Sequence, residues 1–577
     1  MRATRAVTVF SLVLASAALA AWVWWAALPV VDDAAISISY GLSFWEGFGL
    51  RLTHFAPRVE GFTSILWALW TGLGAHLGVD ALAFAHWSGP FFALLGAIVL
   101  GTGPFSTRVP TGALALVACV LFPSVGFWLS SGMETGLQIA TLALGLWVAL
   151  SPASKPVTVG AVLGAMPLVR PEYLALGGLL LALWSVTHLK ARSWRPVLIG
   201  GLAWAAVVGA MFAVRLAYFG DLLPNTYYIK RKWDFNGPNY AGAFLTQHLP
   251  LMGAFVVGLL GLAFAGWWRH LVGFLLVVAG GLQFGAKFGD WMREWRFLVP
   301  LVPFLAAPAA LAWGASSGVP KRLRRGAARV CAVVALGLVV GGAVMQRDRH
   351  VQLKSSPEFP ATFVMENARR FRQQLAGAGV LRPQVGFPDI GGLALVYRDG
   401  VVVDVAGLAD YAIAHASGFP VMEDYFVNEG PPMLVDAHGP SGHVAGFKSL
   451  RQFIPGWGGG LGVLPLTPAE DPRCPGLKPK LSASLDEATA LIGAQLERRQ
   501  PVEALRTWNC VVAYSKQLPS WRATEAWAAR ALALADELEP AQPELALRYL
   551  SFAATVGDDV WARRRAEQLR ERLVAGP

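Results

Sequence analysis

The stretch that decides the fold is AVTVFSLVLASAALAAWVWWAALPVV, residues 6–31, which Asp32-Asp33 follows at once. This apolar run exceeds the roughly 20 residues that cross a bilayer as a helix. Ala18-Leu19-Ala20 is similar to a signal-peptidase site, but the run continues well beyond it, so we favour a retained span. With Arg2 and Arg5 before it, the run predicts a cytoplasmic N-terminus and an external Asp32-Asp33.

The composition extends this prediction to much of the chain. Of 577 residues, 55% are hydrophobic and only 15% are charged, whereas about 25% is usual in soluble domains. The 23 Trp are typical of membrane interfaces. A plain cytosolic enzyme, a disordered scaffold and a disulfide-stapled secreted module are excluded. We predict a multi-pass protein of the inner (plasma) membrane, with membrane lipids as partners.

The basic residues mark loops. The net charge of +11 comes from 48 Lys+Arg against 37 Asp+Glu. Many of the bases lie in short clusters between apolar segments, such as 190–195 and 321–325, which the positive-inside rule places in the cytoplasm. No basic stripe with interleaved aromatics is present, so no nucleic-acid partner is expected.

About eleven spans are expected before residue 346. Between an external Asp32 and a cytoplasmic Lys190 the number of crossings must be odd, yet six apolar segments lie there. Two solutions stay open: residues 157–189 form one long span, or two short segments within residues 62–100 do not both cross. The last span places everything after Gln346 outside.

The chain after Gln346 regains charges and prolines. The predicted division is a transmembrane domain over 1–345, an extracytoplasmic α/β domain over 346–480 and a C-terminal helical bundle over 481–577. Short β-like runs are expected at Leu393–Tyr397 and Val401–Val405. Cys474 and Cys510 fall in this tail and could pair in an oxidising compartment. The fold class is therefore mainly α, a polytopic membrane bundle followed by a soluble α+β tail.

The first external loop carries the strongest functional signal. Asp32-Asp33 is followed by Tyr40 and then by Arg58 and Glu60, so acids, a base and aromatics share one membrane face. Sugar-binding pockets use this mixture: carboxylates accept hydrogen bonds from the sugar hydroxyls, and aromatic faces pack against the sugar C–H groups. The plain alternative is that the aspartates only cap the next helix.

This loop, over residues 32–67, resembles the first external loop of GT-C glycosyltransferases, in particular the group of the mycobacterial terminal arabinofuranosyltransferase. Further segments resemble family elements in order and spacing: SGMET (131–135), RPE (170–172), YFGDLLPNTYY (218–228), GDWMREWRF (289–297), DIGGL (389–393) and DVAGLAD (404–410). The resemblance covers roughly residues 5–410. His54-Phe55-Ala56-Pro57 departs from the expected Asn-Pro-Gly-like turn, which puts acceptor contacts in this loop in doubt.

The resemblance implies an inverting glycosyltransferase that moves arabinofuranose or another sugar from a polyprenyl-phosphate donor to an extracytoplasmic glycan acceptor. An acceptor hydroxyl must lose its proton, which a carboxylate can take as general base; Asp33 is the first candidate and Asp32 the second. Cations must hold the leaving phosphate; the candidates are Lys230, Arg231, Arg293 and Arg296. The expected substrate contacts are Tyr40, Arg58, Glu60, Glu134, Arg170, Glu172, Asn225, Tyr228, Asp290 and Glu294. No cofactor is certain, and the need for a divalent metal stays open.

Several of these residues have structural alternatives. Lys230 and Arg231 could merely bind anionic headgroups. Arg293 and Arg296 could pair with Asp290 and Glu294 as a structural cluster. Arg170 and Glu172, costly at membrane depth, could simply pair with each other.

Two rival functions follow from the same architecture. The first is a transporter or flippase of lipid-linked glycans, which would favour polar residues deep in several spans and two related halves. The second is a membrane-anchored sensor whose tail does the work. The sensor does not explain acids and bases clustered in the loops between spans.

Overall fold

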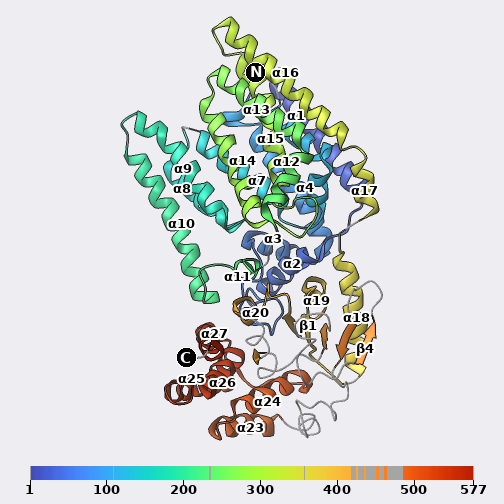
Figure 1. The fold of residues 1–577 in the computed structure, drawn as a ribbon, viewed down its shortest axis with the longest axis vertical. Coiled ribbons are helices and arrows are strands. Elements are labelled where there is room, and N and C mark those ends of the chain that lie inside the picture. The colour runs from blue at the N-terminus through green and yellow to red at the C-terminus, as the bar shows by residue number, and fades with distance from the viewer. Residues whose placement is uncertain are drawn as a thin grey trace. The chain divides into compact units, whose positions relative to one another are not determined.

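The computed structural model describes the chain apart from residues 1, 108–109, 152, 233–234, 357, 378, 418–423, 426–433, 437–449, 454–459, 464–484 and 576–577. Its contacts divide the chain into two compact units. Unit 1 comprises residues 1–34, 63–212 and 233–360, and unit 2 comprises 35–62, 213–232 and 361–577. Figure 1 labels many of their elements.

Unit 1 is built of helices. Their sequences are rich in Ala, Leu, Val and Trp, and a helix satisfies its backbone groups internally, as lipid demands. The elements are α1 (Arg2–Ala26), α3 (Ile65–His76), α4 (Ala81–Leu100), η1 (Gly103–Phe105), α5 (Thr111–Leu121), α6 (Pro123–Ser130), α7 (Thr135–Leu150), α8 (Pro156–Ala165), η2 (Met166–Leu168), α9 (Tyr173–Lys190), most of α10 (Arg195–Phe219), α12 (Gly237–Gln247), α13 (Leu249–Ala265), α14 (Trp268–Phe288), η3 (Val299–Leu301), α15 (Val302–Ser316), α16 (Arg322–Met345) and α17 (Arg349–Ser355).

Within the described residues, seven helices are long and apolar enough to cross a membrane, or nine if two sharply bent pairs each count as one span. The pairs are α5 with α6, bent by 88°, and α12 with α13, bent by 78°. The chain is a multi-pass membrane protein. The expected count of eleven is reached only if two shorter apolar helices, Thr135–Leu150 and Pro156–Leu168, also cross, so it stays a prediction.

The apolar segment near residues 62–78 forms a helix that is shorter than the segment itself. Helix α3 has 12 residues, which at 1.5 Å per residue is about 18 Å, well short of a ~30 Å hydrocarbon core. By length α3 does not cross on its own. This favours the second solution to the odd-crossing problem.

Segment 299–316, made of η3 and α15, is the central helix of unit 1, with 89% of its apolar window buried. Helices α13 and α16 both pack against α15. By contrast, only 28% of the α16 window is buried, so its remaining surface is suited to lipid. Helices α4 and α7 also touch: a Cβ on Gly136 would lie 2.0 Å from the carbonyl oxygen of Gly89. Such small-residue contacts are typical of membrane helix packing.

Unit 2 contains a five-stranded sheet and two groups of helices. Its elements are α2 (Asp32–Trp45, whose first three residues count in unit 1), α11 (Asn225–Lys230), α18 (Ala361–Gly377), β1 (Gln384–Phe387), α19 (Ile390–Val396), β2 (Val401–Asp404), α20 (Tyr411–His415), β3 (Leu434–Asp436), β4 (Leu450–Phe453), β5 (Gly460–Val463), α23 (Asp486–Glu497), α24 (Pro501–Tyr514), α25 (Trp521–Leu538), α26 (Pro543–Val556) and α27 (Val560–Ala575).

The strand order is β2-β1-β3-β5-β4, with β1 parallel to β2 and β3, and with antiparallel pairs β3/β5 and β4/β5. The expected strand at Val401–Val405 is confirmed as β2, but the expected β-run at Leu393–Tyr397 is wrong. That segment lies in α19, which begins after Asp389, and a short apolar run does not by itself distinguish strand from buried helix.

The C-terminal helices α23–α27 pack on one another around a core of Ala, Leu and aromatic side chains. The predicted boundaries at 345 and 480 stay predictions, and the second lies in 464–484, outside the described residues. Cys474 also lies outside them, so its expected pairing with Cys510 is not described.

Candidate functional site

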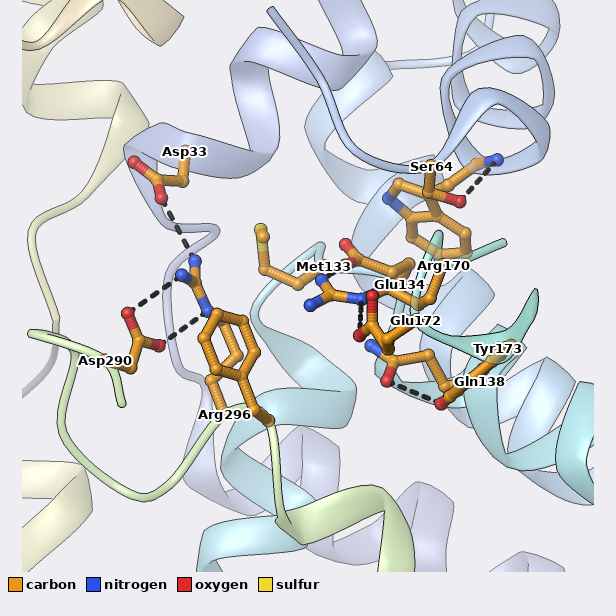
Figure 2. A network of polar contacts seen from close by, with 12 residues as sticks. Asp33, Ser64, Met133, Glu134, Gln138, Arg170, Glu172, Tyr173, Asp290 and Arg296 are labelled. Carbon is orange, nitrogen blue, oxygen red and sulfur yellow. Dashed lines mark hydrogen bonds and ion pairs between the residues drawn. The ribbon is translucent and has the colours of Figure 1, made fainter. Parts of the chain in front are cut away.

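The first predicted base, Asp33, belongs to a chain of ion pairs in unit 1 with Arg296 and Asp290 (Figure 2). Arg296 Nη1 donates to Asp33 Oδ2 at 3.1 Å, and Nη2 donates to Asp290 Oδ1 at 3.0 Å. The side chains of Arg296 and Asp290 are 4% and 2% exposed, whereas Asp33 is 25% exposed. A buried guanidinium therefore orients a carboxylate that a ligand can reach.

The second predicted base, Asp32, is more enclosed than its neighbour. It is 6% exposed, and its backbone N–H donates to the carbonyl of Phe359 at 3.1 Å. Both aspartates lie in the first turn of α2, where the helix dipole favours negative charge. Accessibility thus supports Asp33 as the first candidate.

The loop that carries Arg296 has an unusual backbone. Glu294 and Trp295 both have positive φ, 62° and 50°, a conformation that strains non-glycine residues. The Glu294 carboxylate fixes this turn from both sides, since it accepts from Arg349 at 2.5 and 3.1 Å and from Ser124 at 2.5 Å. Glu294 thus acts in the structure as an anchor of the loop, and Arg296 leaves the turn pointing at Asp33.

A glycine supports the start of α2. Gly132, in the SGMET segment, has φ +81°, and a Cβ there would lie 2.7 Å from Val30 and 3.1 Å from Ala34. Only a residue without a side chain lets the backbone approach the segment that carries the aspartates. Val31 N–H also donates to the Ser131 carbonyl at 3.0 Å, which ties the same segments together.

Arg170 forms the second charged cluster of unit 1. Its Nη1 donates to Glu134 Oε1 and its Nε to Glu172 Oε1, both at 2.7 Å (Figure 2). Burial opposes charge on both partners, but the two glutamates still raise the pKa of Arg170 above its usual value, and Arg170 holds the pKa of Glu134 below its own. The expected Arg170–Glu172 pairing is present, with Glu134 as a third member.

The two arginine clusters are neighbours. The guanidinium carbons of Arg170 and Arg296 lie 4.8 and 4.9 Å from the centroid of the same ring, Phe297. The side chains of Asp33, Glu134, Arg170, Glu172, Asp290 and Arg296 therefore lie close together in unit 1, although they come from four separate segments.

An apolar groove of about 220 Å³ adjoins this cluster in unit 1. It runs between α9 and α14 and is lined by Leu176, Phe284 and Leu301 among other apolar residues, with Glu172 and Lys287 at polar positions. Lys287 is exposed and makes no ion pair with any described carboxylate; its Nζ lies 5.4 Å from the Phe288 ring centroid. The sequence reasoning used Lys287 only to place a loop and missed it as a candidate; a lone cation at the end of a span was the available signal.

Unit 2 holds the remaining predicted residues, which fall into separate contacts. Glu60 Oε1 accepts from Arg215 Nη2 at 3.0 Å, and the pair is almost fully buried. Burial, against the charge of Arg215, raises the pKa of Glu60 to about 7. Tyr40 donates to the Val59 carbonyl at 2.8 Å, which holds the loop of Glu60 in place.

The other predicted substrate contacts of unit 2 are occupied by protein groups. Asn225 donates through Nδ2 to the carbonyls of residues 407, 408 and 410 at 2.9–3.0 Å. Tyr228 donates to Asp221 at 2.7 Å. Arg58 pairs with Asp558 at 2.6 Å. These contacts give Asn225, Tyr228 and Arg58 structural partners, and sequence alone did not predict the pairing with Asp558.

The four predicted phosphate-binding cations have different surroundings. Arg296 is engaged by aspartates. Arg293 pairs with Glu358 at 2.6 Å, so the structural alternative, a cluster with Asp290 and Glu294, does not describe this arginine. For Arg296 the pairing with Asp290 is present. Arg231 is exposed and lies over the Tyr227 ring, and Lys230 is half-buried on α11. In the part of the chain that the structure describes, no group of three or more His, Cys, Asp or Glu is placed to hold a metal ion.

Comparison with known proteins agrees with this geometry. No protein-family model matches the chain. Over 279 residues it is 30% identical to the terminal β-(1→2)-arabinofuranosyltransferase of Mycobacterium tuberculosis, a match that covers 41% of this chain and 43% of that protein. The crystal structure of ArnT from Cupriavidus metallidurans bound to undecaprenyl phosphate superposes with a TM-score of 0.52 at 15% identity, over 79% of this chain and 98% of ArnT.

The chain has an ArnT-like GT-C membrane fold. The predicted resemblance to GT-C glycosyltransferases is thus confirmed, and so is the mainly helical membrane architecture. The curated relative is matched over less than half of its length, so its activity is a hypothesis for this chain and not a result.

Proposed function

We propose that this chain is an inverting membrane glycosyltransferase that takes a sugar from a polyprenyl-phosphate donor and adds it to an extracytoplasmic glycan, with Asp33 as general base. The observation that carries the proposal is the partly exposed Asp33 carboxylate held by the buried Arg296. The mycobacterial relative is an arabinofuranosyltransferase, and the ArnT structure holds undecaprenyl phosphate; both support the substrate classes.

The reaction places one role on Asp33. An acceptor hydroxyl donates its hydrogen bond to Oδ1, the oxygen that makes no hydrogen bond to any described residue. As the hydroxyl oxygen forms its bond to the anomeric carbon, its proton passes to the carboxylate. The bond from the anomeric carbon to the phosphate oxygen breaks, and the electron pair leaves with the polyprenyl phosphate. Attack opposite the leaving group inverts the configuration.

Arg296 acts as a positioning residue in this scheme. Both of its ion-pair partners are aspartates, and Asp290 is more deeply buried than Asp33. Asp290 therefore fixes the guanidinium, and the guanidinium fixes the Asp33 carboxylate. Such preorganisation places the base within hydrogen-bond reach of the acceptor before the substrate arrives.

The groove between α9 and α14 is the proposed path of the donor lipid. Its lining is mostly apolar, which suits a polyprenyl chain, and Lys287 lies at its lining with no carboxylate partner among the described residues. A single ammonium is a suitable point contact for a phosphate. Lys230, Arg231 and Arg293 stay secondary candidates for the same phosphate.

The test is a transfer assay with the full chain in proteoliposomes. A panel of radiolabelled polyprenyl-phosphate sugars, each offered with glycan acceptors, identifies the donor by label incorporated into glycan. The proposal expects incorporation from at least one donor, with loss in Asp33→Asn. Movement of intact labelled lipid across the bilayer without glycan labelling would instead establish the flippase alternative and overturn the proposal.

A further inference from the structure

Unit 2 contains its own cavity, of about 260 Å³. The walls come mainly from the 51–57 loop, strand β2, residues 409–410 with the start of helix α20, and helices α24, α26 and α27. None of these wall residues belongs to the Asp33 or Arg170 clusters. Helices α24, α26 and α27 also lie beyond residue 410, outside the part of the chain that resembles the GT-C family in sequence.

The walls combine aromatic faces with charges that neutralise one another. Trp508 and Tyr411 line the cavity, and the Arg563 guanidinium carbon lies 4.7 Å from the centroid of the Tyr411 ring. Arg51 and Asp558, both wall residues, form an ion pair. This balance suits a neutral, polar ligand better than an ion. Concave sites with aromatic walls and a few fixed polar groups are typical of small-molecule binding.

One oxygen of a buried carboxyl in the wall lacks a hydrogen-bond partner among the described residues. Glu567 is 6% exposed, and its Oε1 accepts from Arg570. Its Oε2 is buried and has no hydrogen-bond partner among the described residues. Buried polar atoms are normally paired, so an unpaired one calls for a ligand or a water. Burial, with help from the charge of Asp410, raises the pKa of Glu567 to about 8, so the group carries a proton at neutral pH and can donate to a hydroxyl.

We propose that this cavity binds a single sugar ring. The hydroxyls of the sugar bind Glu567, and one face of the sugar ring packs on the Trp508 or Tyr411 side chain. The volume lies just under the ~300–1,000 Å³ range of ordinary ligand sites, which limits the ligand to about one ring. The sugar class rests on the proposed function, because the ring would belong to the glycan that the enzyme extends. The site serves to hold that glycan while a different part of it reacts.

The test measures binding without turnover. Saturation-transfer NMR and calorimetry on the full chain in nanodiscs use methyl α-arabinofuranoside, methyl β-galactofuranoside and methyl α-mannoside as probes, with no donor present. At least one probe is expected to bind with a Kd of about 1 mM or tighter. Trp508→Ala should weaken that binding at least about fivefold. The matched control is Trp521→Ala, the same substitution on α25 at a side chain that is 68% exposed and lies outside the cavity.

Two further variants keep the test decisive if Trp508→Ala fails to fold. Thr555→Trp adds bulk at an exposed position that lines the cavity and should block binding without disturbing the core. Glu567→Gln keeps a donor and the shape, and should weaken binding only about two- to threefold. Binding of no probe, or binding that Trp508→Ala and Thr555→Trp both leave unchanged, overturns the inference.

The outcome is separable from that of the proposed function. Asp33→Asn lies outside the cavity and should bind the probe as the wild type does. Transfer by the wild type without any cavity-dependent probe binding would refute this site and leave the glycosyltransferase proposal intact. Cavity-dependent binding in a protein that shows no transfer would leave this site intact and refute the glycosyltransferase proposal.

Discussion

At the scale of single residues, the site depends on which of two adjacent aspartates is accessible. Asp33 is partly exposed, with 25% of its side chain accessible, whereas Asp32 is buried, although they are neighbours in sequence. The proposed reaction needs a carboxylate that touches the acceptor, and it gives the buried one only a supporting role. The two residues can be separated by parallel amide substitutions, which change charge but hardly change shape.

Asp33→Asn is expected to lower the rate of sugar transfer by about 10²–10⁴-fold, because the general base is lost. Donor binding, measured with labelled polyprenyl-phosphate sugar, should change little. Asp32→Asn should lower the rate much less. Equal, full turnover in both variants would remove the carboxylates of this loop from the mechanism.

Arg296→Gln should reduce both stability and rate. It removes the ion pair between Arg296 and the Asp290 carboxylate, whose side chain is 2% exposed, and the loss of one member of a buried ion pair costs about 3–5 kcal/mol of unfolding free energy. The double variant Asp290→Asn/Arg296→Gln should recover much of the thermal stability while transfer stays low. Recovery of transfer in the double variant would show that Arg296 only stabilises the fold and does not position Asp33.

The sequence pointed to Asp33 and to Arg296 as site residues but did not predict that they form an ion pair. Asp33 and Arg296 are 263 positions apart. Arg293 and Arg296 look alike in the GDWMREWRF segment, and only the positive-φ turn at Glu294 and Trp295 decides which guanidinium reaches Asp33. Tertiary contacts impose that conformation, and the residue types in the segment do not predict it.

At the scale of elements, a contact between backbones positions the start of α2. The SGMET segment crosses this start at Gly132, and the added Cβ of Gly132→Ala would lie 2.7 Å from Val30 with φ at +81°. We expect a loss of about 1–3 kcal/mol in stability from the strained backbone. We also expect a lower kcat with little change in KM for the donor, because Asp33 is displaced.

Gly78→Ala offers a matched control for Gly132→Ala. Gly78 has the same φ, +81°, but a Cβ there meets nothing within 4 Å. It should carry the backbone strain without the effect on kcat. Thermal unfolding and steady-state kinetics of the two variants separate strain from displacement.

The groove between α9 and α14 gives a second prediction at this scale. Lys287→Gln should raise KM for the lipid donor about tenfold, since a charge-assisted contact to phosphate is lost. It should leave the unfolding temperature unchanged, because Lys287 is exposed and has no described ion-pair partner. Unaltered donor KM in Lys287→Gln would place the phosphate elsewhere.

Element boundaries were the weaker part of the sequence reasoning. Strand β2 was predicted from its Val-rich run, whereas the similar run at Leu393–Tyr397 is helical. Both runs are short and apolar, so local periodicity cannot choose between them. The helix includes Gly391-Gly392 near its start, and the second glycine packs tightly, since a Cβ on Gly392 would lie 2.6 Å from the Ala361 carbonyl.

At the scale of the whole molecule, buried acids should make stability depend on pH. Burial raises the pKa of Asp404 to about 7, despite hydrogen bonds from the backbone N–H groups of Ala406 and Ala409, and raises that of Glu567 to about 8. The folded chain therefore keeps protons that the unfolded chain releases near pH 4. Their contribution to stability is complete below about pH 4 and is lost as pH rises through 7–8.

The free energy of unfolding should thus fall between pH 5 and 8.5, by up to about 1.4 kcal/mol per pH unit for each group. The unfolding temperature, which is measured, should fall with it. Asp404→Asn cannot ionise and should flatten the lower part of this profile. Glu525→Gln, at an exposed position of α25, should leave it unchanged. A profile that Asp404→Asn does not alter would contradict the assigned protonation.

The membrane architecture was the most predictable property of the chain. Apolar runs and loop charges act locally and are visible in sequence, so the helical bundle and most of its spans were expected. The bends between α5 and α6 and between α12 and α13 were not, because each depends on packing around a break of very few residues. The association of β2 with α24, α26 and α27 around a cavity also depends on contacts more than 100 residues apart.

The left-handed pair at Glu294 and Trp295 has a consequence for protein engineering. Glycine would remove the backbone strain at either position, but it would also remove the Glu294 carboxylate that accepts from Arg349 and Ser124, or the Trp295 ring that lies 5.2 Å from the Arg349 guanidinium. A glycine substitution made to relieve strain at this turn is therefore expected to lower both the unfolding temperature and the rate of transfer, because the same side chains hold the loop and position Arg296.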